Sequence, residues 1–134
     1  MRIPAAFPWL AILAIVAIVV PPNALAQKVP NRPIDAAQVV SAIDRGVGYL
    51  KRQQGPRGSW DEIAPYDGGV TALCTLALIN SGVPVDDPVV RKALDYLRPM
   101  EPAWTYSVSL QTMVLCAAEP KKDQLIIRRN VKWL

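Results

Sequence analysis

A short pattern recurs three times along the chain and limits the folds that the chain can adopt. Residues 45–50 (RGVGYL), 92–97 (KALDYL) and 129–134 (RNVKWL) each begin with a basic residue and end with an aromatic residue followed by leucine. These segments start 47 and 37 residues apart. Two strongly apolar segments, VTALCTLAL from Val70 and LQTMVLCAA from Leu110, recur 40 residues apart. Two kinds of segment that repeat with nearly the same period indicate an array of repeated units.

The hydrophobic spacing indicates that each repeated unit is a pair of helices. Between Val39 and Leu50 the apolar residues stand three or four positions apart, which places them in one stripe along a helix. We expect helices that begin near Asp35, Gly69, Asp87, Tyr106 and Asp123. The second and fourth are apolar on nearly every side and the others are amphipathic, so we expect buried inner helices packed against outer ones. No segment shows the sustained alternation of a strand, and the predicted fold class is all-α.

The N-terminal residues 1–26 have the features of an export signal. Arg2 precedes an unbroken apolar run at residues 10–20, two prolines follow, and Ala24-Leu25-Ala26 supplies the small residues that signal peptidase requires. Cleavage before Gln27 would release a periplasmic or extracellular chain. The alternative is a membrane anchor formed by residues 7–20, although the run is shorter than a spanning helix requires. Residues 27–34 contain two prolines and no periodicity, which predicts a linker ahead of a helical domain at 35–134.

The composition excludes several kinds of site. The formal net charge of +4 comes without any long run of Lys or Arg, so we do not expect nucleic acid as a partner. Histidine is absent, which removes the commonest general base and metal ligand, and we expect no metal and no cofactor. Cys74 and Cys116 can form a disulfide in an exported chain, but both stand in apolar stretches. We therefore interpret each cysteine as filling a small core position.

The first copy of the pattern extends into a longer motif. Seven positions fit the order basic, small, two variable, aromatic, Leu, three variable, Gln, three variable, Gly, one variable, Trp. These residues are Arg45, Gly46, Tyr49, Leu50, Gln54, Gly58 and Trp60. The second copy is worn, with Glu101 near the Gln position and Trp104 retained, and the third copy stops before its Gln and Trp.

This motif resembles the QW motif of the prenyltransferase and squalene oxidase repeat family, which includes squalene–hopene cyclases, other terpenoid cyclases and protein prenyltransferase β-subunits. The resemblance covers residues 35–134. It implies an α/α toroid, an α6–α6 barrel-like ring, of which this chain would form an incomplete part with about two and a half hairpins. We expect the chain to be a truncated portion that leaves the apolar face of its last helices exposed.

The resemblance also implies roles for individual residues. Gln54 would bond a helix end, Gly58 would allow a tight turn and Trp60 would cover the junction between repeats, so these residues are interpreted as scaffold. Four residues stand just ahead of the two apolar helices, where a closed ring would have its cavity. These candidate lining residues are Tyr66, Asp67, Trp104 and Tyr106. Their alternative role is in turns and packing, and no catalytic residue is identified.

Three functions stay open at this point. The first is an exported, non-catalytic helical-repeat scaffold with an apolar isoprenoid-like ligand or a protein as its partner. The second is a terpenoid cyclase-like enzyme whose catalytic residues lie beyond Leu134. No Asp-x-Asp-Asp sequence occurs here, and Asp86-Asp87 is interpreted as a helix cap. A protein prenyltransferase-like transferase is the third, but its zinc site needs a histidine that the chain does not have.

Overall fold

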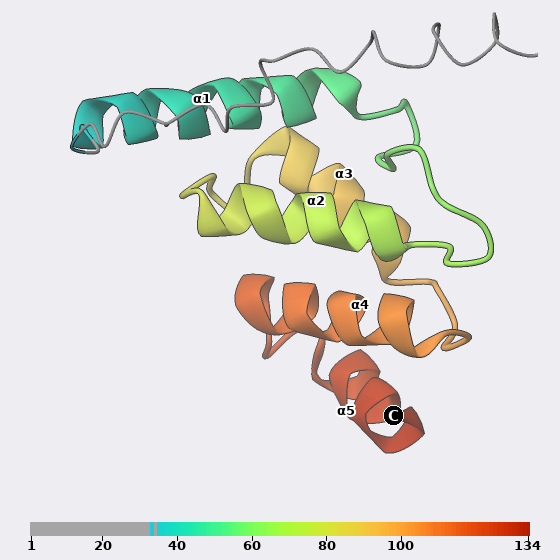
Figure 1. Ribbon diagram of the computed structural model, residues 1–134. Coiled ribbons are helices and arrows are strands. Elements are labelled where there is room, and N and C mark those ends of the chain that lie inside the picture. The colour runs from blue at the N-terminus through green and yellow to red at the C-terminus, as the bar shows by residue number, and fades with distance from the viewer. Residues whose placement is uncertain (1–32, 34) are drawn as a thin grey trace, which may run out of the picture. The chain divides into compact units, whose positions relative to one another are not determined.

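The computed structural model describes residue 33 and residues 35–134, and the helices belong to one unit, Ile34–Leu134. The predicted signal peptide at 1–26, the anchor at 7–20 and nearly all of the predicted linker at 27–34 lie outside the described residues. The described part contains five helices and no strand (Figure 1). They are α1 (Ala36–Gln53), α2 (Gly69–Asn80), α3 (Pro88–Leu97), α4 (Thr105–Ala118) and α5 (Gln124–Trp133). The all-α prediction is confirmed for this part, and the incomplete α/α toroid of about two and a half hairpins stays a prediction.

The helix starts follow from their capping residues. The carboxylate of Asp35 accepts a hydrogen bond from the Ala37 N–H at 3.0 Å, and that of Asp87 accepts one from the Val89 N–H at 2.9 Å. Pro88 occupies the first position of α3, where a missing N–H costs nothing. Asp123 precedes α5 as expected, but its side chain makes no capping bond and binds Arg98 of α3 instead.

The core lies between α2, α3 and α4. Its largest fully buried apolar side chains are Leu78, Val90, Leu94, Leu97, Val114 and Leu115. Helix α2 packs against α3 and runs beside α4, and α4 packs against α5 (Figure 1). Helix α1 has the fewest contacts, and its stripe from Val39 to Ile43 is exposed. Between residues 35 and 134, no helix combines the length and the apolar character needed to cross a membrane.

The expectation that α2 and α4 are buried on nearly every side is only partly right. Each helix packs one side on an outer helix and another side on its inner neighbour, and the remaining side is open. Leu73 of α2 is 49% exposed, and Tyr106 and Met113 of α4 are 48% and 54% exposed. Cys116 is also exposed, so the interpretation of both cysteines as core residues fails for it. Cys74 is half-buried, and burial raises the pKa of its thiol.

The structure corrects the alignment of the two apolar helices. Helices α2 and α4 begin 36 residues apart, at Gly69 and Thr105, and α3 and α5 also begin 36 residues apart, at Pro88 and Gln124. With this offset four of the five buried residues of α2 coincide with buried residues of α4. The pairs are Thr71 with Ser107, Ala72 with Val108, Thr75 with Gln111 and Leu78 with Val114. The offset of 40 is wrong by about one helical turn, which leaves a residue on nearly the same face.

Candidate functional site

Gln54 connects the end of α1 to α3. Its amide Nε2 donates to the Gly58 carbonyl at 3.0 Å and to the Val89 carbonyl in the first turn of α3 at 2.8 Å. Gly58 has a φ of +88°, and a Cβ at this position would collide with the Lys92 carbonyl of α3. The loop after α1 can therefore approach α3 closely only because residue 58 is a glycine.

Trp60 connects the same loop to both α1 and α2. Its indole Nε1 donates to the Leu50 carbonyl at 2.9 Å, and its backbone N–H donates to the Thr71 hydroxyl at 3.1 Å. Leu50 lies in the last turn of α1, where carbonyls have no intrahelical partner. The ring itself is buried in the core. Trp60 thus covers the junction between α1 and α2 and also satisfies a free helix carbonyl.

The first half of the motif makes fewer contacts than the second. Arg45 donates to the Ser41 hydroxyl on the exposed surface of α1, and Tyr49 is exposed. A Cβ added to Gly46 would meet nothing within 4 Å. Leu50 is half-buried against the core. Of the seven motif residues, Leu50, Gln54, Gly58 and Trp60 therefore make the contacts that hold α1 to the other helices.

Two ion pairs link successive outer helices in the same way. Lys51 follows the aromatic–Leu pair of α1 and binds the cap residue Asp87 of α3, with Nζ and Oδ2 2.6 Å apart. Arg98 follows the aromatic–Leu pair of α3 and binds Asp123 ahead of α5, with Nε and Oδ1 2.9 Å apart. We call these two ion pairs the helix joints. Both joints have the same sequence pattern, in which a basic residue follows the aromatic–Leu pair and an aspartate stands ahead of the next outer helix. The recurring segments at 45–50 and 92–97 end one residue before this basic position, so the repeat alone does not reveal the joints.

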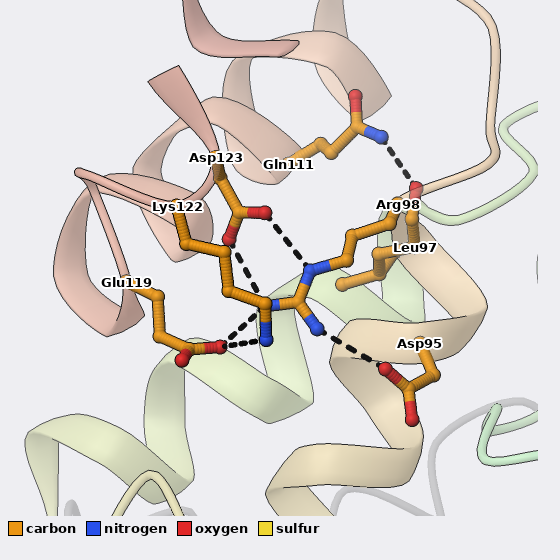
Figure 2. Close-up of polar contacts among 7 residues, drawn as sticks. All are labelled: Asp95, Leu97, Arg98, Gln111, Glu119, Lys122 and Asp123. Carbon is orange, nitrogen blue, oxygen red and sulfur yellow. Dashed lines mark hydrogen bonds and ion pairs between the residues drawn. The ribbon is translucent and has the colours of Figure 1, made fainter. Parts of the chain in front are cut away.

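Arg98 is the centre of a larger polar cluster (Figure 2). Besides Asp123, its guanidinium contacts the carboxylates of Asp95 and Glu119, and Glu119 also binds Lys122. Hydrogen bonds from Lys122 and Arg98 hold the pKa of Glu119 below its usual value. Hydrogen bonds to Asp123 and Glu119 in turn raise the pKa of Arg98. A hollow of about 500 Å³ beside the cluster is lined by equal numbers of acidic and basic residues. Because Arg98 pairs with three carboxylates and Lys122 pairs with one of them, we interpret the cluster as structural.

A buried amide chain connects α3, α4 and α5. Gln111 donates to the Leu97 carbonyl at 2.6 Å, and its Oε1 accepts from Asn130 Nδ2 at 2.7 Å. Asn130 donates in addition to the Thr112 hydroxyl at 3.2 Å. Sequence reasoning did not identify these residues, although a glutamine inside an apolar helix was a visible signal. These hydrogen bonds give the buried side-chain amides of Gln111 and Asn130 their partners, and they fix the position of α5 on α4.

Three of the four predicted cavity residues come together. The Tyr66 ring meets those of Trp104 and Tyr106 edge to face, with both centroid separations 5.8 Å. An open hollow of about 380 Å³ lies beside them, lined by Ile63, Tyr66, Val70 and Tyr106. Asp67 does not join this group, because it lines a separate cavity of about 10 Å³ with Ser107 and Gln111.

The aromatic group continues along the open side of the inner helices. Leu73 stands one turn beyond Val70 and therefore lies on the same side of α2. Met113 stands two turns beyond Tyr106 and lies on the same side of α4. We call this surface the aromatic face. It consists of Ile63, Tyr66, Val70, Leu73, Trp104, Tyr106 and Met113. Within residues 35–134 no cluster of three His, Cys, Asp or Glu residues is arranged to hold a metal ion.

No protein-family model, no curated protein and no solved structure matches this chain. The candidate site has two parts: a set of buried polar contacts that hold the helices together, and an exposed aromatic face.

Proposed function

We propose that this chain is an exported, non-catalytic scaffold of the prenyltransferase and squalene oxidase repeat type that binds an apolar, isoprenoid-like ligand on its aromatic face. The observation that supports the proposal is the exposure of large aromatic side chains around the starts of the inner helices α2 and α4. Tyr66, Trp104 and Tyr106 are all exposed although the Tyr66 ring packs edge to face against the other two. An exposed patch of this kind is typical of a ligand or partner surface.

The chemistry of the face favours a hydrocarbon ligand. Its hollow is lined by two aromatic and two aliphatic side chains, with the tyrosine hydroxyls as the only side-chain polar groups. Covering apolar surface is worth roughly 25 cal/mol per Å², and aromatic rings offer large rigid areas at little cost in side-chain entropy. A branched, unsaturated chain can follow the stripe from Tyr106 towards Met113.

Binding without chemistry is supported by where the nearby carboxylates lie. A cyclase-type reaction needs an acid that delivers a proton to the ligand on the face. Glu62 accepts three hydrogen bonds at the start of α2, and Asp67 lines the separate small cavity. Neither residue lines the hollow in which the ligand is proposed to lie.

The proposal is tested by titrating the exported chain with farnesol while following tryptophan fluorescence. We expect saturable binding and a Tyr106→Ser variant that binds roughly tenfold more weakly, because it removes about 1.4 kcal/mol or more of ring contact. Leu125→Ser is the matched control, because Leu125 is 81% exposed on α5, away from the face. Absence of saturable binding, or equal weakening in both variants, would contradict the proposal. Capture of a protein instead of farnesol would point to the partner-scaffold alternative.

A further inference from the structure

A carboxylate caps the start of α2 in an unusual way. Glu62, from the preceding loop, accepts hydrogen bonds from the Val70 N–H at 3.0 Å and the Thr71 N–H at 3.2 Å. It also accepts one from the Thr71 hydroxyl. These donors are the second and third N–H groups of the helix and the side chain of its third residue. Free N–H groups and the helix dipole make this end a favourable place for a negative charge.

Helix α4 has the same donors at the equivalent positions. With the offset of 36 residues, Val70 corresponds to Tyr106, and Thr71 corresponds to Ser107. The residue ahead of α4, Trp104, offers no capping side chain. In the described part of the chain, no acceptor meets the N–H groups of Tyr106 and Ser107. With this offset Arg98 stands at the place of Glu62, and Glu101, the carboxylate in the loop between α3 and α4, binds Arg129 instead.

The hydroxyl of Ser107 is an independent sign of a missing acceptor. Ser107 is more than nine-tenths buried, and its Oγ has no hydrogen-bond partner within residues 35–134. It lines the cavity of about 10 Å³ that begins beside Asp67 and Gly68, at the start of α4. A buried hydroxyl without a partner is unfavourable by about 1–3 kcal/mol, so such groups are rare unless something binds them.

We propose that the start of α4 binds the carboxylate of a ligand whose apolar part lies on the aromatic face. This inference rests on the proposed function and names its ligand class, an apolar carboxylate. Tyr106 connects the two parts, because its N–H is one of the donors and its ring lines the apolar hollow. The occupant is inferred from Glu62, whose carboxylate accepts hydrogen bonds from the equivalent donors of α2.

Two neighbours set the conditions for binding. The cavity has room for about one water molecule, so the ligand enters by displacing Met100, whose flexible thioether lies over Gly68. Asp67 and Glu101 also line the cavity and repel an anion, but Glu101 is paired with Arg129 at 3.0 Å. Removing the remaining charge in an Asp67→Asn variant is therefore expected to strengthen binding of a carboxylate.

The test compares two ligands that share one apolar body, farnesoate and farnesol, on the exported chain at neutral pH. We expect farnesoate to bind about tenfold or more tightly than farnesol, because hydrogen bonds to a charged group are strong. Ser107→Ala is expected to remove most of this preference and to leave farnesol binding unchanged. Ser109→Ala, two residues further along α4, is the matched control and is expected to keep the preference.

Amide chemical shifts provide a second readout that needs no variant. Farnesoate, and not farnesol, is expected to shift the amide resonances of Tyr106 and Ser107 downfield. Equal affinity for the two ligands, or unshifted amides with only a water beside Ser107, overturns the carboxylate site and leaves the proposed function intact. If neither ligand binds, both proposals fail. If the Ser107→Ala chain does not melt cooperatively, the amide shifts alone decide.

Discussion

Trp60 donates its indole N–H to the Leu50 carbonyl, one of the carbonyls that α1 leaves without an intrahelical partner. A Trp60→Phe variant keeps an aromatic ring but leaves this part-buried carbonyl unsatisfied and a small gap beside it. We expect the free energy of unfolding to fall by about 1–3 kcal/mol. Urea denaturation measures this change. Trp104→Phe is the control, because Trp104 is exposed, and a change below about 0.5 kcal/mol is expected there.

Asn130 is the residue that fixes α5 on α4. An Asn130→Leu variant has a similar volume but leaves the Gln111 Oε1 without its donor inside the protein. We expect a loss of about 1–3 kcal/mol, since the amide chain loses a buried hydrogen bond. Chemical denaturation followed by circular dichroism tests this, with exposed Arg128→Ala as the control. A Leu variant as stable as the parent would mean that apolar packing alone holds α5.

Residue by residue, the sequence reveals motif positions more readily than their partners. Gln54 and Trp60 stand out because their spacing is unusual, and both side chains bond groups in other segments. Glu62 and Asn130 do not stand out, because polar residues of these types are common on helix and loop surfaces. Their importance depends on burial, which arises from packing between helices that no local pattern specifies.

At the scale of helices, the Lys51–Asp87 joint connects α1 to α3. The hydrogen bond from Lys51 lowers the pKa of Asp87, so the folded chain holds this carboxylate ionised to lower pH than the unfolded chain does. The joint therefore adds its full stability above about pH 4, which is the ordinary pKa of an aspartate in an unfolded chain. This stability is lost as the pH falls through the lower pKa that Asp87 has in the folded chain. We expect Lys51→Met to be less stable than the parent at pH 7 and equal to it near pH 2. A constant difference at both pH values would show that the lysine acts through packing alone.

The Arg98–Asp123 joint connects α3 to α5 and is more buried. An Arg98→Met variant leaves Asp123, which is 3% exposed, without its cation. We expect a loss near the lower end of the about 3–5 kcal/mol typical of a broken buried pair, because Arg98 keeps some contact with solvent. Thermal and urea unfolding measure the loss. Arg91→Met is the matched control on the exposed side of α3, and a similar loss there would refute this assignment.

The sequence locates helices better than it aligns them. The predicted starts at Asp35, Gly69 and Asp87 are confirmed because capping residues and glycine act locally. The start of α4 is one residue earlier than expected, at Thr105. The inner-helix offset was wrong because apolar residues recur every turn, so a slip of one turn preserves the pattern. Whether a third neighbour covers α2 cannot be read from its composition, since an all-apolar helix looks the same in either case.

At the scale of the whole described region, large apolar side chains are exposed in three places. One is the aromatic face over α2 and α4, and the second is the stripe of α1 from Val39 to Ile43. The third is α5, where Leu125, Val131 and Trp133 are exposed. Helical hairpins bury their apolar sides on neighbouring hairpins, so a side without a neighbour stays open. The aromatic face is the most organised of these surfaces, because the Tyr66 ring packs edge to face on both Trp104 and Tyr106 beside a hollow.

The exposed aromatic face predicts reversible self-association of the exported chain. We expect the apparent mass in sedimentation experiments to rise with concentration, since covering apolar surface favours contact between copies. Leu73→Gln together with Met113→Gln should reduce association, and saturating farnesol should reduce it in the parent chain by covering the same face. Leu125→Gln is the control, because it removes an equally apolar side chain from α5. If the control variant dissociates and the double variant does not, copies associate through α5, and the aromatic face remains free for its ligand.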